Sequence, residues 1–230
     1  MAEQKIPNRP YVSGDGWCWV YIARHGQNKN AAIWLKNKYN DESNEPMVPN
    51  DQDVLSYQGI VQVKDLASTL VNSLSRPPFS NKTVRTLFSP SPRAKQTHKV
   101  LVHNLQQNNI TVLDSSERLA LTEMRSFEYN PATSVSVQNH ITEFLQIIHT
   151  AMDPDVPILI VSHGNITRMA LSRLCGFPSH VQWGPGIASL TSLQINRRTG
   201  QIVIHGLGET SHSLNTFTWN PDDLFAKKGT

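Results

Sequence analysis

Two short motifs place a histidine and a glycine directly after an apolar run. Arg24-His25-Gly26 follows the run 17–23, and Ser162-His163-Gly164 follows the run 158–161. Imidazole groups serve as nucleophiles and as general acids or bases near neutral pH. Arginine binds anionic groups through a planar fork of N–H donors. The repeated pattern predicts one site that binds an anion and uses both imidazoles.

The elements around these motifs bring further residues to the same place. Apolar runs rich in aromatic and β-branched residues predict buried strands, and open α/β sheets bind ligands at the carboxyl ends of their strands. Arg93 follows a predicted strand over 83–88 and stands in the first turn of a helix, while Glu123 follows another short apolar run. We therefore expect a crevice that is cationic and short of carboxylates.

This set of side chains suits phosphoryl transfer. Guanidinium forks, glycine amides and helix N-termini all donate hydrogen bonds to a dianionic phosphate. A neutral imidazole can attack phosphorus and form a phosphohistidine, and the surrounding cations stabilise the charge on the equatorial oxygens. The leaving alkoxide then needs a proton, and Glu123 is the best-placed donor if burial favours its protonated form.

The order of the predicted elements indicates the fold class. Strands alternate with amphipathic helices, and a hairpin over 190–205 follows, which predicts a three-layer α/β/α sandwich with a mostly parallel mixed sheet. Ser56 is the expected N-cap of a helix that reaches Leu74, and Gly176 is expected to end a helix over 165–174. We expect a flexible N-terminal arm over 1–16, a single domain over 17–217 and a polar tail over 218–230.

Composition excludes several classes of partner. The net charge is only +3, and charged residues make up 17% of the chain without forming a basic block, which argues against nucleic acid. No apolar run approaches the length of a membrane span, and the N-terminal residues lack an apolar signal core. Cys18 and Cys175 are expected to be buried free thiols in a reducing, cytoplasmic setting. The remaining histidines lack metal-ligand spacing, so neither a metal nor a cofactor is expected.

Four blocks along the chain resemble the signature of a known superfamily. They are Tyr21–Gly26, Ser89–Thr97, Leu121–Glu123 and Val161–Gly164, and they are similar, in this order, to blocks of the histidine phosphatase superfamily, in its phosphoglycerate mutase-like branch. The segments 55–62 and 209–214 are similar to two supporting blocks. Four ordered blocks at predicted element boundaries are far more specific than one tripeptide.

The resemblance implies a role for each matching residue. His25 would be the phosphorylated nucleophile, Glu123 the acid and base, and Arg24, Arg93 and His163 the phosphate-binding partners, in a reaction that needs no metal. Substrate contacts would come from the following residues: Gly26, Gly164, Asn165 and His212. The family's phosphate-contacting asparagine is replaced by Ala31, and Asn28 or Asn30 is the candidate substitute.

The favoured function is a metal-independent phosphatase of the histidine acid type, with water as the phosphoryl acceptor. In mutases of the family, the segment between the acid and the second histidine is longer and carries the basic residues that hold phosphoglycerate. Here its 39 residues, from Met124 to Ser162, offer Arg125 and little else. A phosphorylated small molecule is the expected substrate, ahead of a phosphoprotein. A phosphomutase and a catalytically silent binding or scaffold protein remain the alternatives, and the sequence carries no signal for the oligomeric state.

Overall fold

A computed structural model describes residues 16–39, 44–75, 79, 82–123, 135–176 and 184–210. The expected N-terminal arm, except for Gly16, and the expected tail over 218–230 lie outside this part of the chain.

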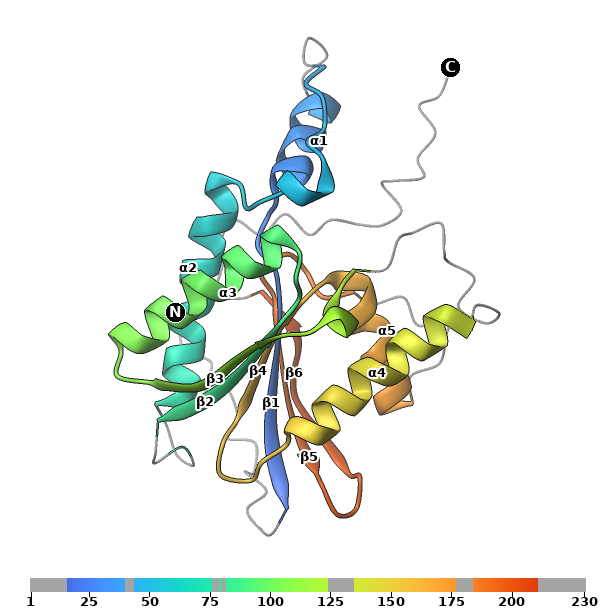
Figure 1. Ribbon diagram of the computed structural model, residues 1–230. Coiled ribbons are helices and arrows are strands. Elements are labelled where there is room, and N and C mark those ends of the chain that lie inside the picture. The colour runs from blue at the N-terminus through green and yellow to red at the C-terminus, as the bar shows by residue number, and fades with distance from the viewer. Residues whose placement is uncertain are drawn as a thin grey trace, which may run out of the picture.

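One sheet forms the centre of the described structure (Figure 1). Its strands, in sequence order, are β1 (Trp17–Arg24), β2 (Thr83–Phe88), β3 (Thr111–Glu117), β4 (Ile158–Ser162), β5 (Leu190–Asn196) and β6 (Ile202–Glu209). They lie in the order β3-β2-β4-β1-β5-β6. Strands β3, β2, β4 and β1 pair in parallel, and β5 pairs antiparallel with both β1 and β6. The predicted mostly parallel mixed sheet is confirmed.

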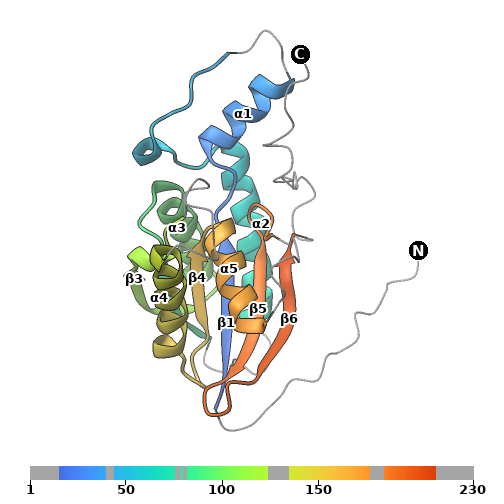
Figure 2. The ribbon, with the colours of Figure 1, turned by 90° about the vertical axis from the view of Figure 1, so that its right-hand side faces the viewer.

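Two pairs of helices cover the two faces of the sheet. Helices α2 (Tyr57–Leu74) and α3 (Pro92–Gln107) lie on one face, and α4 (Val135–Ala151) and α5 (Gly164–Cys175) lie on the other (Figures 1 and 2). Successive side chains of a strand point to opposite faces. Accordingly, Val20 and Ile22 pack in the core with α4 and α5, whereas Tyr21 and Ala23 pack in the core with α2 and α3. The predicted three-layer sandwich is thus confirmed.

The helix boundaries follow local rules that the sequence shows. Ser56 is the N-cap of α2, and its hydroxyl accepts a hydrogen bond from the Gly59 amide at 3.0 Å. Gly176 ends α5 in the left-handed conformation, with φ of +68°. Both predictions are confirmed. No helix in the described ranges is long and apolar enough to cross a membrane.

Two elements differ from the expected pattern. Strand β3 continues to Glu117, four residues beyond its apolar part, because β2 runs beside it as far as Phe88 and keeps the backbone ladder satisfied. The apolar run before Glu123 forms a 3₁₀ turn, η2 (Leu119–Leu121), rather than a strand. At this point β2 has ended, so the backbone bonds locally, from the Thr122 amide to the Leu119 carbonyl at 2.9 Å.

Helix α1 (Lys29–Tyr39) extends beyond the carboxyl end of β1 (Figures 1 and 2). Only Ile33 among its residues is buried. The chain returns through the short 3₁₀ turn η1 (Asn50–Gln52) to the start of α2. The segment from α1 to η1 lies next to the end of the sheet that carries both histidine motifs.

Candidate active site

The two histidine motifs lie side by side because β1 and β4 are parallel neighbours. Arg24 pairs with Ser162 in the register, and the His25 amide donates to the Ser162 carbonyl at 3.1 Å. The next residue of each strand is therefore a histidine at the same edge of the sheet. The imidazole centroids of His25 and His163 are 5.0 Å apart, with an angle of 63° between the rings.

His25 carries its lone pair on Nε2. Its Nδ1 lies 2.8 Å from the Gly26 carbonyl, which can only accept, so Nδ1 holds the hydrogen in the neutral ring. Burial, followed by the charges of Arg93 and Arg24, lowers the pKa of His25 well below its usual value. At neutral pH the side chain is therefore an uncharged imidazole with a nucleophilic Nε2.

The loop after His25 is fixed by side chains from α2 and α3. The Gly26 amide donates to Thr97 Oγ1 at 3.3 Å, and the Gln27 amide donates to Gln62 Oε1 at 3.0 Å. A Cβ on Gly26 would lie 2.5 Å from the Gly59 carbonyl oxygen, so only glycine allows α2 to start this close to the loop. The nucleophile thus stands on a rigid support.

Arg24 reaches along the first turn of α5. Its Nη1 donates to the Pro185 carbonyl at 2.7 Å. Gly164 makes room for the guanidinium, since a Cβ there would lie 3.0 Å from Arg24 Cζ. The Arg24 Nε is buried and has no hydrogen-bond partner among the described residues. A buried donor of this kind needs an acceptor, and an anion bound in the pocket would supply one.

Arg93 stands between the nucleophile and a carboxylate. Its Nε donates to His25 Nε2 at 3.2 Å, and its Nη1 forms an ion pair with Asp53 Oδ2 at 3.4 Å. Pro92 and Arg93 open α3, as expected for a residue in the first turn of a helix. Asp53 is a second carboxylate beside the expected Glu123, so the site holds more negative charge than the sequence predicts.

His163 is the N-cap residue of α5 and has no exposed surface. Its Nε2 lies 2.8 Å from Ser89 Oγ and 3.1 Å from Ser91 Oγ. Its Nδ1 is buried without a partner among the described residues. Burial and the neighbouring His25 and arginines lower the pKa of His163 well below its usual value, which makes it a second neutral imidazole.

Glu123 lies at the N-terminus of the same helix. The amides of Asn165 and Ile166 donate to its carboxylate at 3.5 and 3.4 Å. Its charge also acts on Arg24, where it raises the pKa of the guanidinium against the larger lowering caused by burial. The N-terminus of α5 thereby holds the Glu123 carboxylate near the Arg24 guanidinium.

The remaining residues expected to contact substrate bond to the backbone or to carboxylates, or lie outside the described residues. Asn28 Nδ2 donates to Asp53, and both ends of the Asn30 amide bond to the Val48 backbone, at 2.8 and 2.9 Å. Both side chains therefore close the loop that carries α1. Asn165 provides a backbone amide to Glu123, while His212 lies outside the described residues.

Three parts of the site were missed by sequence reasoning. Asp53 lies 40 residues from Arg93, and no pattern connects the two. Ser89 and Ser91 stand inside a recognised block, yet only Arg93 was singled out there. The segment 184–189 is the third. Ala188 has φ of +52°, rare for a residue with a Cβ, and its amide donates to the His25 carbonyl at 3.0 Å.

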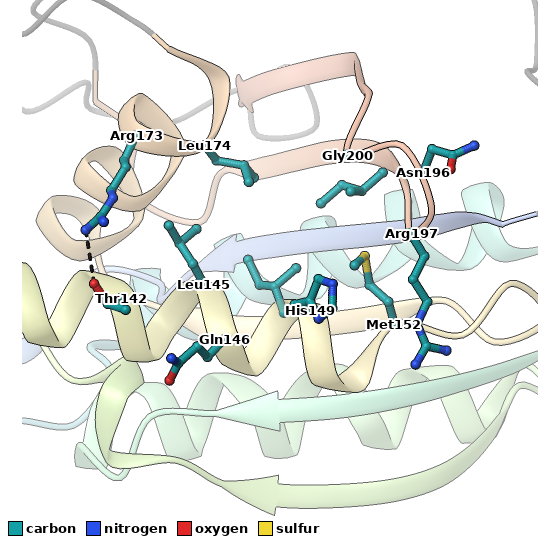
Figure 3. Close-up of a pocket in the computed structure, with 12 residues that line it drawn as sticks. Thr142, Leu145, Gln146, His149, Met152, Arg173, Leu174, Asn196, Arg197 and Gly200 are labelled. Atoms are coloured by element: carbon teal, nitrogen blue, oxygen red, sulfur yellow. Dashed lines mark hydrogen bonds between the residues drawn. The ribbon is translucent and has the colours of Figure 1, made fainter.

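An apolar cavity of about 320 Å³ lies at the other end of the sheet (Figure 3). Leu145, Met152 and Leu174 line it, with Arg173 and Arg197 near its rim. It adjoins Asn196, which pairs with Trp17 at the start of β1, seven residues before Arg24. The cavity is therefore separate from the histidine pair. No cluster of metal-ligating side chains occurs within the described ranges.

The strand order, the two helical layers and the site at the strand ends define a phosphoglycerate mutase-like α/β fold. No family model matches the sequence, and no curated protein sequence matches it. Solved structures do match. The phosphoglycerate mutase from Bacillus anthracis is 16% identical, with a TM-score of 0.59 over 86% of this chain and 95% of that one.

Two phosphatases match to a similar extent. The alpha-ribazole phosphatase from Shigella flexneri is 17% identical, with a TM-score of 0.57 over 84% of this chain and 96% of its own. The mycobacterial glucosyl-3-phosphoglycerate phosphatase is 14% identical, with a TM-score of 0.55 over 83% and 98%. At these identities the likeness establishes the fold, and this is the fold that the resemblance of the four sequence blocks implies.

Proposed function

We propose that this protein is a phosphatase that hydrolyses a phosphomonoester through a phosphohistidine on His25. The observation that carries the proposal is the state of His25. Its Nδ1 is occupied by the Gly26 carbonyl, and its Nε2 lone pair faces Arg93 in a pocket where Arg24 Nε and His163 Nδ1 have no partner in the described structure. A phosphate group brings an acceptor oxygen to the buried Arg24 Nε–H and an electrophile to His25 Nε2.

The reaction has two balanced steps. In the first, His25 Nε2 attacks phosphorus, the bond to the leaving oxygen breaks, and Glu123 gives that oxygen a proton. In the second, water attacks phosphorus, the P–N bond breaks, and Glu123 takes the proton from the water. Arg24 and Arg93 stabilise the equatorial oxygens in both steps. Arginine supplies the positive charge, so the proposed acid-type phosphatase needs no metal.

The proposed substrate is a phosphorylated small molecule. Two of the matching structures are named for phosphatases of small phosphorylated compounds, alpha-ribazole phosphate and glucosyl-3-phosphoglycerate. Free thiols at Cys18 and Cys175 support a reducing, cytoplasmic setting. A mutase is the second candidate, because the fold is shared with a phosphoglycerate mutase. Net release of orthophosphate distinguishes the phosphatase from the mutase, which returns the phosphoryl group to its product.

The test is a screen of phosphorylated metabolites and phosphopeptides for orthophosphate release, with a chelator present throughout. The wild-type protein is expected to release phosphate from at least one metabolite, and His25→Ala is expected to abolish the release. His103→Ala is the matched control, because His103 is exposed on α3 and takes no part in the site. Full activity of the His25→Ala protein would refute the assignment of the nucleophile.

A further inference from the structure

Asp53 is a buried carboxylate at the edge of a pocket that we assign to an anion. It is 2% exposed and lies between η1 and the start of α2. Burying an ionised carboxylate is costly unless hydrogen bonds and a cation compensate. Within a phosphate pocket it also repels the substrate. Desolvation of the carboxylate and repulsion of an anionic substrate are both unfavourable, so the contacts of Asp53 must offset both.

The contacts of Asp53 show where the carboxylate acts. Its Oδ1 accepts from the Asn30 amide at 3.0 Å, in the first turn of α1. Its Oδ2 accepts from the Asn28 side chain and from Arg93 Nη1, the latter at 3.4 Å. One carboxylate thus connects the beginning of α1 to a guanidinium in the pocket.

The geometry of Arg93 depends on both of its contacts. Its Nη1 edge faces Asp53, while its Nε donates to the reacting atom, His25 Nε2, at 3.2 Å. The side chains of Arg93 and Asp53 are only 15% and 3% exposed, so water screens their attraction weakly. Because a guanidinium is planar and rigid, fixing one edge fixes the direction of the other.

We propose that Asp53 is a positioning residue that aims Arg93 Nε at the phosphoryl group on His25. It also couples the loop with α1 to the catalytic pocket, since the same carboxylate holds the Asn30 amide. This inference rests on the proposed function and deepens it. Through these contacts of Asp53, the described part of the loop over 28–53 influences catalysis by way of the orientation of Arg93.

The simpler view is that Asp53 only stabilises the start of α1. Asp53→Asn separates the two views, because asparagine keeps the size and an oxygen for the Asn30 amide but loses the charge that holds Arg93. We expect kcat/KM for an aryl phosphate to fall at least about tenfold, the effect of one lost charge-assisted hydrogen bond, with little change in Tm. Asp51→Asn, an exposed neighbour in η1, is the control and should match the wild type.

A double-mutant cycle tests the route through Arg93. In an Arg93→Ala background, Asp53→Asn should have no further effect on kcat/KM, because the group that it orients is gone. Additive losses would contradict the proposal and favour a separate structural role. If Asp53→Asn does not fold, Asp53→Ser replaces it, since serine also accepts from a first-turn amide without carrying charge.

A measurement without turnover keeps this inference independent of the proposed function. The Arg93 Nε–H signal in a ¹H–¹⁵N spectrum, assigned by its loss in Arg93→Lys, should be protected from exchange in the wild type. It should exchange rapidly in Asp53→Asn. An unchanged signal in that variant would overturn the positioning role, even for a protein with full phosphatase activity. A protected signal that is lost in Asp53→Asn would support the role even if no phosphate release were found.

Discussion

The direction of a single imidazole distinguishes His25 from the other buried histidines. His98 is also buried, and burial lowers its pKa to about 4. Its Nε2, however, lies 2.9 Å from Thr86 Oγ1, and its ring stacks on Phe88, which are structural contacts. His25 instead points Nε2 at the Arg93 guanidinium, close to Arg24 Nε and His163 Nδ1, two buried nitrogens without a partner among the described residues. Burial alone therefore does not identify a nucleophile, whereas the contacts of each ring nitrogen do.

Glu123 should matter most where the leaving group is a poor one. Glu123→Gln removes the proton donor but keeps the shape and an acceptor for the α5 amides. We expect hydrolysis of an alkyl phosphate to slow by about 100-fold or more, the usual range for general acid catalysis. A nitrophenyl phosphate, whose leaving oxygen needs no proton, should slow far less. Steady-state kinetics on the two substrates check this.

Equal losses on both substrates would mean that Glu123 acts by holding α5 or Arg24 rather than by proton transfer. Glu117→Gln is the matched control, because Glu117 pairs with Lys95 at 2.8 Å on the surface and should leave both rates unchanged.

The sequence predicted the site residues that stand directly at strand and helix ends. His25, His163, Arg24 and Arg93 could be placed together because parallel strands end at one edge of a sheet. Asp53 could not, because a residue in a long loop has no periodicity that fixes its position. Ala188 could not be predicted either, because its positive φ is usual for glycine or asparagine and alanine gives no sign of it.

Among the elements, the start of α2 is bonded directly to the loop that follows the nucleophile. Ser56 makes two contacts there. Its hydroxyl donates to Gln27 Oε1 at 2.7 Å and accepts from the Gly59 amide at 3.0 Å. A single side chain therefore caps the helix and ties it to the loop that follows His25.

Ser56→Ala is expected to lower the free energy of unfolding by about 1–2 kcal/mol, the usual cost of losing an N-cap. Urea denaturation measures it. Ser68→Ala on the exposed side of the same helix is the control, since its hydroxyl bonds only to the Lys64 carbonyl one turn earlier. A loss for Ser68→Ala as large as that for Ser56→Ala would show that the cap is not the cause.

Periodicity predicted the helices and the buried strands better than the edges of the sheet. Helix α2 and strand β4 carry clear apolar patterns, and both formed as expected. The sequence did not predict the full length of strand β3, because Asp114, Ser115 and Ser116 are polar residues that break the apolar pattern of this edge strand. Pairing with β2, rather than side-chain burial, holds that half of the strand in place.

At the scale of the whole molecule, the two ends of the sheet have different chemistry. The carboxyl ends of β1, β2 and β4 lead into the polar residues of the candidate site, and α1 extends beyond them. The opposite end carries the apolar cavity between α4, α5 and the β5–β6 turn. Three buried imidazoles, those of His25, His98 and His163, tie the stability of the fold to pH because burial lowers their pKa values.

Stability should fall when the pH drops below about 6.5. His25, His98 and His163 have pKa values lowered by burial, so at pH 5 the unfolded chain binds three protons that the folded chain does not. The folded state loses stability as pH falls through this range, by about 1.4 kcal/mol per histidine per pH unit. For His98 the loss levels off below a pH of about 4, where the folded form also binds its proton.

Urea unfolding at pH 7.5 and pH 5.0 measures this loss. Replacing His98 by asparagine should remove about a third of the difference, whereas the exposed His103→Gln should leave it unchanged. Equal stability at the two pH values would show that these imidazoles are not neutral in the folded protein.

The central claim is that His25 Nε2 accepts the phosphoryl group. Rapid quenching of the enzyme during turnover, followed by mass spectrometry of its peptides, measures this directly. The account predicts one added phosphoryl group on the peptide that contains His25, labile in acid and stable in base, and absent from His25→Ala. Turnover with no phosphorylated His25 under any quench condition, or with the phosphoryl group on another residue, would contradict it.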